Sequence, residues 1–118
     1  IKETIGDPVK GGAADFYFHT MIVDAAHSPA LSSVYAAVAK LLQQSHTERR
    51  RVIASVPGVD AYLVDHHEAI MLAIRRKNAS EADALLAEHF EIGANLRENA
   101  ADVGAQRRSK PPVTQRVP

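Results

Sequence analysis

The chain of 118 residues contains no cysteine and no tryptophan, and it has only three tyrosines and three phenylalanines. Without cysteine, disulfides and thiolate metal sites are excluded. Basic and acidic residues number 14 each, so no net positive charge is available to attract nucleic-acid phosphates. No apolar run approaches the ~20 residues of a membrane span, and no signal peptide is visible. We therefore expect one domain with one core, cytoplasmic and without membrane attachment.

Four segments with helical periodicity are separated by short breaks, and no β pattern of useful length is present. Capping signals mark the starts: Asp7-Pro8 and Ser28-Pro29 each place proline after a capping residue, and Ser80 is expected to cap the last helix. The predicted fold class is all-α, an antiparallel helical bundle with a metal site in its core. The expected helices span about residues 8–26, 29–45 with a continuation to 54 left open, 59–77 and 81–103.

We assign residues 1–104 to a single ligand-binding helical domain. Residues 1–6 are expected to be the remainder of a helix that began upstream. After Gly104 the composition becomes basic and rich in proline, with too few apolar residues to fold alone. Residues 105–118 are therefore predicted to form a flexible tail.

The expected third helix carries an apolar stripe with one polar member, His67, at a position where the spacing requires a core residue. A polar group on a buried face needs a partner. Two other helices show the same anomaly, one at Asp15 and His19, which are four residues apart, and one at His89. The apolar members of the third stripe are Val59, Leu63, Ile70 and Ile74.

In an antiparallel bundle these four polar groups can converge in the interior. One carboxylate and three imidazoles suit a divalent metal ion, with zinc first and nickel, iron or manganese as alternatives. Four protein ligands would fill a tetrahedral site, whereas a larger coordination shell would leave two positions open. The competing interpretation is that the histidines are hydrogen-bonded residues of an ordinary core.

The remaining histidines and arginines are assigned to less central places. His66 is expected to be peripheral or to support a ligand, and His27 and His46 to be surface or capping residues. The run Arg49-Arg50-Arg51 is interpreted as a solvated face, although Arg49 continues the inward stripe of the second helix. That stripe is predicted to consist of Leu31, Val34, Val38, Leu41, Leu42 and Ser45.

Four motifs, taken in order, carry a resemblance to a known family. Over about residues 7–97 the chain resembles the effector-binding C-terminal (FCD) domain of GntR-type transcription regulators, in the FadR subfamily. The motifs are Asp15-Phe16-Tyr17-Phe18-His19, Ala25-Ala26-His27-Ser28-Pro29-Ala30-Leu31, His67-Glu68-Ala69-Ile70-Met71-Leu72-Ala73-Ile74 and Ala82-Asp83-Ala84-Leu85-Leu86-Ala87-Glu88-His89-Phe90.

The resemblance implies that Asp15, His19, His67 and His89 ligate a divalent metal in a helical bundle. It also implies a small organic acid as effector, bound beside or on the metal, and hence a ligand sensor of a bacterial regulator rather than an enzyme. Full regulators of this type are dimers that bind DNA through an N-terminal winged helix, which this sequence lacks.

The sequence departs from the family in two places. The first one or two helices of the family's domain, where an arginine often holds the effector carboxylate, are missing or reduced to residues 1–6. Among the arginines present, Arg49 is the candidate for carboxylate binding because it extends the inward stripe. His27 stands where the family often has asparagine.

Two further functions stay open beside the sensor. A metal-dependent hydrolase could use the same residues to activate water, but neither a well-placed carboxylate base nor a phosphate-binding loop is visible. A structural or dimerisation bundle without metal would satisfy the histidines by hydrogen bonds alone.

Overall fold

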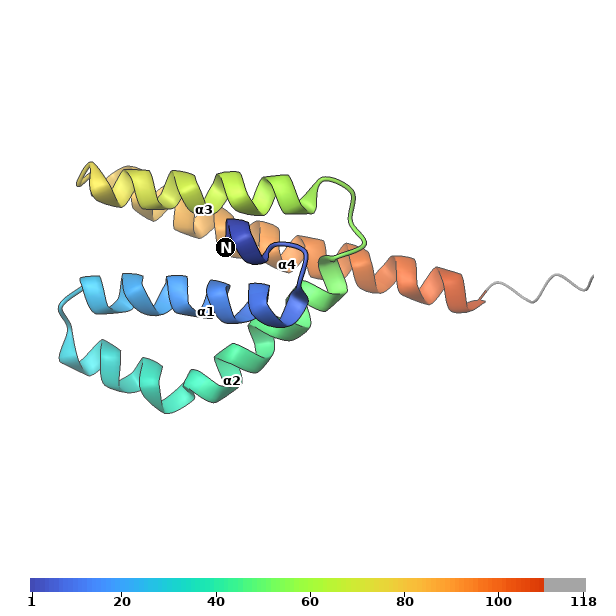
Figure 1. Cartoon of the computed structure of the whole chain (residues 1–118), viewed down its shortest axis with the longest axis horizontal. Helices are drawn as coiled ribbons and strands as arrows, with labels where there is room; N and C mark the ends of the chain where they lie inside the picture. Colours follow the sequence, from blue (N-terminus) through green and yellow to red (C-terminus); the bar gives the residue numbers. More distant parts are fainter. Residues whose placement is uncertain (110–118) are drawn as a thin grey trace, which may run out of the picture.

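The computed structural model describes the backbone of residues 1–109 and the side chains of residues 1–99. Successive long helices run in opposite directions, so that α1 and α2 form one hairpin and α3 and α4 another (Figure 1). Helix α4 packs against α2 as well as α3, which joins the two hairpins. The predicted all-α antiparallel bundle is confirmed for this part of the chain. Its elements are η1 (Lys2–Thr4, a 3-10 turn), α1 (Pro8–Ala25), α2 (Pro29–Ile53), α3 (Val59–Arg75) and α4 (Ala79–Ser109).

The helix starts follow the capping signals with one exception. Asp7 caps α1 and Ser28 caps α2, each followed by proline, as predicted. The prediction that Ser80 caps α4 is wrong. Asn78 does so: its Oδ1 accepts from the backbone N–H of Glu81 at 3.2 Å, and its Nδ2 donates to the Glu81 carboxylate at 2.9 Å. This reciprocal pairing starts α4 earlier than the sequence suggested.

The tight turns after α1 and α3 contain residues in the left-handed backbone region. His27 has φ 50° and Lys77 has φ 58°. Asparagine, aspartate and histidine are the side chains most often found in this region, which gives a physical reason why asparagine and histidine can exchange at position 27. His27 is exposed, as predicted.

The glycine pair in α1 marks the place where α1 packs most closely on its neighbours. A Cβ atom on Gly12 would lie 2.6 Å from the Cα of Thr47 in α2, and one on Gly11 would lie 3.0 Å from the carbonyl oxygen of Thr4. Glycine costs a helix about 1 kcal/mol relative to alanine. Here the missing side chains let α1 approach both η1 and α2.

Helix α2 is one continuous helix, and its buried face differs from the prediction. The predicted stripe is wrong at Leu31, Val34, Val38 and Leu41, which are 45%, 64%, 38% and 67% exposed, and Ser45 is exposed as well. The inward face consists of Tyr35, Leu42, His46, Arg50 and Ile53. The contact of Gly12 with Thr47 sets this rotation, because it brings the face that carries His46 and Arg50 towards α1.

The interior holds more polar than apolar side chains. Among the described residues five apolar side chains are buried, and seven polar or charged ones are buried with them. Helix α3 supplies most of the apolar group, although Ile74 is 38% exposed and Ala73 takes the place predicted for it. The polar group is therefore the centre of the fold. It comprises Asp15, His19, His46, Arg50, His66, His67 and His89.

Helix α4 is longer than predicted at both ends. It runs through the expected domain boundary at residue 104 and continues to Ser109. Residues 110–118 of the predicted tail lie outside the described part of the chain. In the described part, no helix combines the length and the apolar character needed to cross a membrane.

Candidate metal centre

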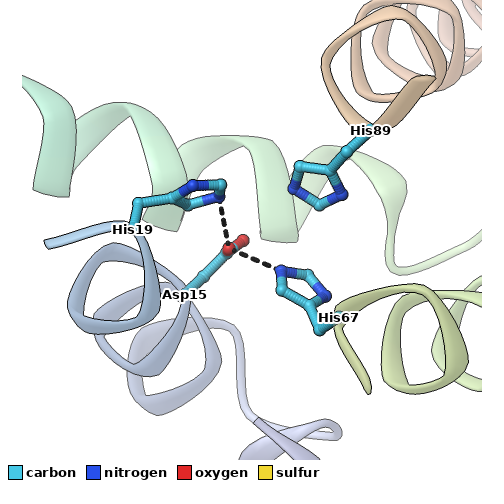
Figure 2. A group of neighbouring side chains, drawn as sticks. All are labelled: Asp15, His19, His67 and His89. Carbon is cyan, nitrogen blue, oxygen red and sulfur yellow. Dashed lines mark hydrogen bonds and ion pairs between the residues drawn. The ribbon is translucent and has the colours of Figure 1, made fainter. Parts of the chain in front are cut away.

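The structure brings the four predicted ligands together from three helices. Asp15 and His19 come from α1, His67 from α3 and His89 from α4, and Figure 2 shows their side chains pointing at one another. Each offers one ligand atom, and these atoms all lie within 4.8 Å of one another. All four residues are buried, and Asp15 is only 1% exposed.

Hydrogen bonding fixes which nitrogen of His67 faces the centre. Its Nδ1 lies 2.6 Å from the backbone carbonyl oxygen of Leu63, one turn earlier in α3. A carbonyl oxygen only accepts, so Nδ1 carries the proton and donates. Nε2 lies 3.0 Å from Asp15 Oδ1, a distance at which the two atoms share a proton or bind a common cation in its place.

The imidazoles of His19 and His89 are short of partners. His19 Nε2 and both ring nitrogens of His89 are buried without a hydrogen bond within the described residues. Burial, followed by the charges of His67 and His19, lowers the pKa of His89 to about 3. His89 is therefore neutral at pH 7, with a lone pair available for a ligand.

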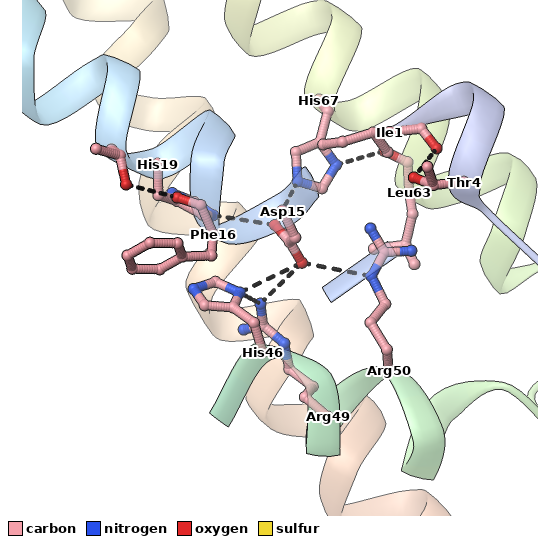
Figure 3. Close-up of polar contacts among 11 residues, drawn as sticks. Ile1, Thr4, Asp15, Phe16, His19, His46, Arg49, Arg50, Leu63 and His67 are labelled. Carbon is pink, nitrogen blue, oxygen red and sulfur yellow. Dashed lines mark hydrogen bonds and ion pairs between the residues drawn. The ribbon is translucent and has the colours of Figure 1, made fainter. Parts of the chain in front are cut away.

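Helix α2 contacts Asp15 from the other side (Figure 3). Arg49 Nη2 donates to Asp15 Oδ2 at 3.2 Å and to His46 Nδ1 at 2.8 Å, while Arg50 Nε lies 3.4 Å from the same Oδ2. Because Arg49 donates to His46 Nδ1, this nitrogen is already engaged. Burial alone would raise the pKa of the Asp15 carboxyl, but contacts with His19, His46 and His67 hold that pKa well below its usual range.

Two of these residues were misassigned from sequence. His46 was expected to be a surface or capping residue and Arg50 to lie on a solvated face, yet they are 9% and 4% exposed. All three guanidinium nitrogens of Arg50 are buried without a hydrogen bond in the described structure. The missed signal is spacing: His46 and Arg50 lie four residues apart, as Asp15 and His19 do.

The arginines leave the cluster with excess positive charge. Two guanidinium groups face one carboxylate, and Asp15 is the one buried acid among the described side chains. An uncompensated charge in a buried place is costly. A divalent cation would add to the excess, so this arrangement calls for a further anion.

Aromatic rings enclose the cluster. His66, expected to be peripheral or to support a ligand, is buried. Its Nε2 donates to the Leu85 carbonyl oxygen at 3.1 Å, and its ring stacks on His89 with a centroid distance of 5.4 Å. Tyr62 in turn stacks on His66. Phe18 packs edge-on against His67 at 4.9 Å, and Phe90 lies over His19 at 5.7 Å. These scarce aromatic residues cover part of the cluster, and the electrostatic interactions behind them are stronger than in water.

The donor set fits a divalent metal. Three imidazole nitrogens and a carboxylate oxygen are the usual ligands of zinc and its neighbours. His67 also shows the hydrogen bond to a backbone carbonyl that typically orients a metal-bound imidazole. The buried group at Asp15, His19, His67 and His89 can therefore hold a metal ion, while His46, Arg49 and Arg50 border the carboxylate.

Comparison with known proteins gives one match. No curated protein and no solved structure matches the chain. The family model of the FCD domain matches residues 2–92, well over half of the chain. FCD domains are the C-terminal effector-binding domains of GntR-family regulators, which bind small molecules and contact DNA through a separate domain. On this match the chain belongs to the FCD domain family, as a ligand-sensing regulatory domain.

Proposed function

We propose that this chain senses a small organic acid through a divalent metal ion, zinc first, held by Asp15, His19, His67 and His89. The observation that carries the proposal is the convergence of these four buried side chains, whose ligand atoms all lie within 4.8 Å of one another. His19 Nε2 and the ring nitrogens of His89 are buried without a hydrogen bond among the described residues, so they are available to bind an ion. When bound, the ion supplies positive charge and a place for an oxygen ligand.

The excess positive charge supports a carboxylate as the effector. With the ion present, two guanidinium groups and a divalent cation would face one carboxylate. An effector carboxylate would restore the balance, and Arg49 can bind it because its guanidinium lies at the edge of the cluster and is the less buried of the two. Arg50, with its unpartnered nitrogens, would contribute charge from the interior.

Binding would act by favouring one helix arrangement over another. Asp15 contacts the arginines of α2 within its own hairpin and His67 of α3 in the other hairpin. An ion and an acid that compete for Asp15 would therefore change how the two hairpins pack against each other. In a complete regulator of the FadR type we propose that the chain forms a homodimer in the cytoplasm, with DNA bound by a winged-helix domain outside this sequence.

The metal is tested first, on protein purified without a histidine tag. Elemental analysis and calorimetric titration with zinc, nickel, iron(II) and manganese should show one ion per chain. His67→Ala should abolish this binding, because His67 supplies a ligand. His27→Asn is the matched control: it removes an exposed histidine and retains a residue that tolerates its positive φ. Equal metal binding by the two variants would refute the site.

The effector is tested on metal-loaded and chelator-treated protein with a panel of small organic acids. We expect binding only to the loaded form, and a loss of about tenfold or more in Arg49→Met, because charge-assisted hydrogen bonds contribute about 1.5–3 kcal/mol. Arg51→Met, an exposed neighbour of the same charge, should bind as the wild type does. Turnover of a phosphoester that His67→Ala abolishes would favour the hydrolase instead, and absence of any metal would favour the structural bundle.

A further inference from the structure

A cavity adjoins the metal centre between α1, α2 and α4. It measures about 360 Å³ and opens to solvent. Its wall is formed almost entirely of aliphatic and aromatic carbon. Its lining residues include His19, Tyr35, Leu42, His46, Leu86 and Phe90.

The cavity shares two walls with the polar cluster. His19 and His46 line it, and each also lies 3.4 Å from a carboxylate oxygen of Asp15. The two imidazoles stack with a centroid distance of 5.2 Å. Only the imidazole ring of His19 or His46 therefore lies between Asp15 and a molecule in the cavity. Arg49, bonded to both His46 and Asp15, lies at the same end of the cluster.

Aromatic rings from α2 and α4 line the cavity. Phe90 from α4 stacks on His19 at 5.7 Å, with 26° between the planes. Tyr35 from α2 stacks on Phe16 of α1 at 5.8 Å, with 14° between the planes. Leu42 and Leu86 complete the wall with branched aliphatic carbon. Such a surface binds an aromatic ring well and offers almost no partner for hydroxyl groups.

We propose that this cavity, which we name the aryl pocket, holds the apolar body of the effector, and that the effector is an arylalkyl carboxylic acid. The inference rests on the proposed function, because the carboxylate is assigned to the metal and Arg49. It adds the chemical class of the effector: the pocket prefers an acid with an aromatic ring to short acids and to polyhydroxy acids. The latter would leave their hydroxyl groups unpaired against carbon.

The test compares phenylacetate, acetate and gluconate on zinc-loaded protein by calorimetry. Phenylacetate differs from acetate only by its ring, so their affinity ratio measures the pocket. We expect phenylacetate to bind at least about tenfold more tightly than either other acid. Equal or tighter binding of acetate or gluconate would overturn the aryl pocket and leave metal-dependent sensing intact. If no acid distinguishes loaded from metal-free protein, the proposed function itself fails.

Leu42→Trp fills the pocket and Leu41→Trp is its matched control, since Leu41 is 67% exposed on the same helix. Leu42→Trp should lose about tenfold or more in phenylacetate affinity while zinc and acetate affinity stay unchanged, and Leu41→Trp should match the wild type. Leu42→Ala serves if the tryptophan variant does not fold. By enlarging the pocket it should shift the preference from phenylacetate to naphthylacetate. An unchanged preference in the folded variants would contradict the proposal.

Discussion

Gly12 in α1 lies against the backbone of Thr47 in α2 so closely that a Cβ atom on the glycine would stand 2.6 Å from the Thr47 Cα. The neighbour is backbone, so neither helix can yield by rotating a side chain. This contact holds α1 against the half of α2 that carries His46 and Arg50. It therefore fixes the position of the helix that brings both residues to Asp15.

Gly12→Ala should destabilise the fold although alanine is the better helix former. The helix gain is about 1 kcal/mol, whereas overpacking costs about 1–3 kcal/mol and sometimes more, so we expect a net loss together with weaker metal binding. Urea denaturation and zinc titration measure the two effects. Gly6→Ala is the control, because nothing lies within 4 Å of a Cβ at that position. A Gly12→Ala protein as stable as the wild type would contradict the close contact.

Arg50→Met should tighten zinc binding. It removes a buried positive charge beside Asp15 and replaces the arginine stem with apolar atoms of similar length, so the ion meets less repulsion. We expect an increase of about tenfold in affinity, by competition with a chelating dye, and little change in stability without metal. Arg51→Met changes the total charge equally from an exposed position and should leave the affinity unchanged. Weaker zinc binding in Arg50→Met would refute the charge argument.

The burial of the four proposed ligands could be predicted from sequence because each one interrupts an apolar stripe. Asp15, His19, His67 and His89 occupy positions where spacing requires a buried side chain, and a polar residue there has few explanations. The helices around them could be placed by the same periodicity and by the proline-containing caps. The cap of α4 at Asn78 was not predicted because Ser80, two positions later, offers an equally good local capping signal.

Helix α2 could not be oriented in the same way. It carries two overlapping stripes, an apolar one through Val34, Val38, Leu41 and Leu42 and a mixed one through Leu42, His46 and Arg50. Hydrophobicity favours the first, yet the second is buried, because the approach at Gly12 and the charge of Asp15 select it. Both causes arise from another helix, so the local pattern does not contain them. Arg50 and His46 were missed for this reason.

Stability without metal should fall as the pH is lowered, because burial, followed by the charges of His67 and His19, lowers the pKa of His89 to about 3. An unfolded histidine has a pKa near 6.5. Between these values the unfolded chain binds a proton that folded His89 does not, so the stability is complete above pH 6.5 and declines towards pH 3. Asp15 acts in the same direction, since its folded pKa also lies below the ordinary value.

Urea denaturation in the presence of a chelator at several pH values measures this decline, which should reach a few kcal/mol between pH 7 and pH 4. His89→Leu should flatten the profile over this range, because the proton-binding difference at that position disappears. His27→Asn, which removes an exposed histidine, should keep the wild-type slope. A His89→Leu profile as steep as that of the wild type would mean that His89 is not held neutral by its surroundings.

Asp15→Asn should be the most damaging conservative change in the chain. It retains the size of the side chain but removes the single negative charge that faces Arg49, Arg50 and the histidines. Breaking a buried ion pair by removing one partner costs about 3–5 kcal/mol, and the loss of a charged ligand should abolish zinc binding. Thermal and urea unfolding, with and without zinc, measure both effects. Asp65→Asn, on the exposed side of α3, is the matched control and should retain both properties. If Asp15→Asn still gained stability from zinc, the ion would have to be held without the carboxylate on which the proposed site depends.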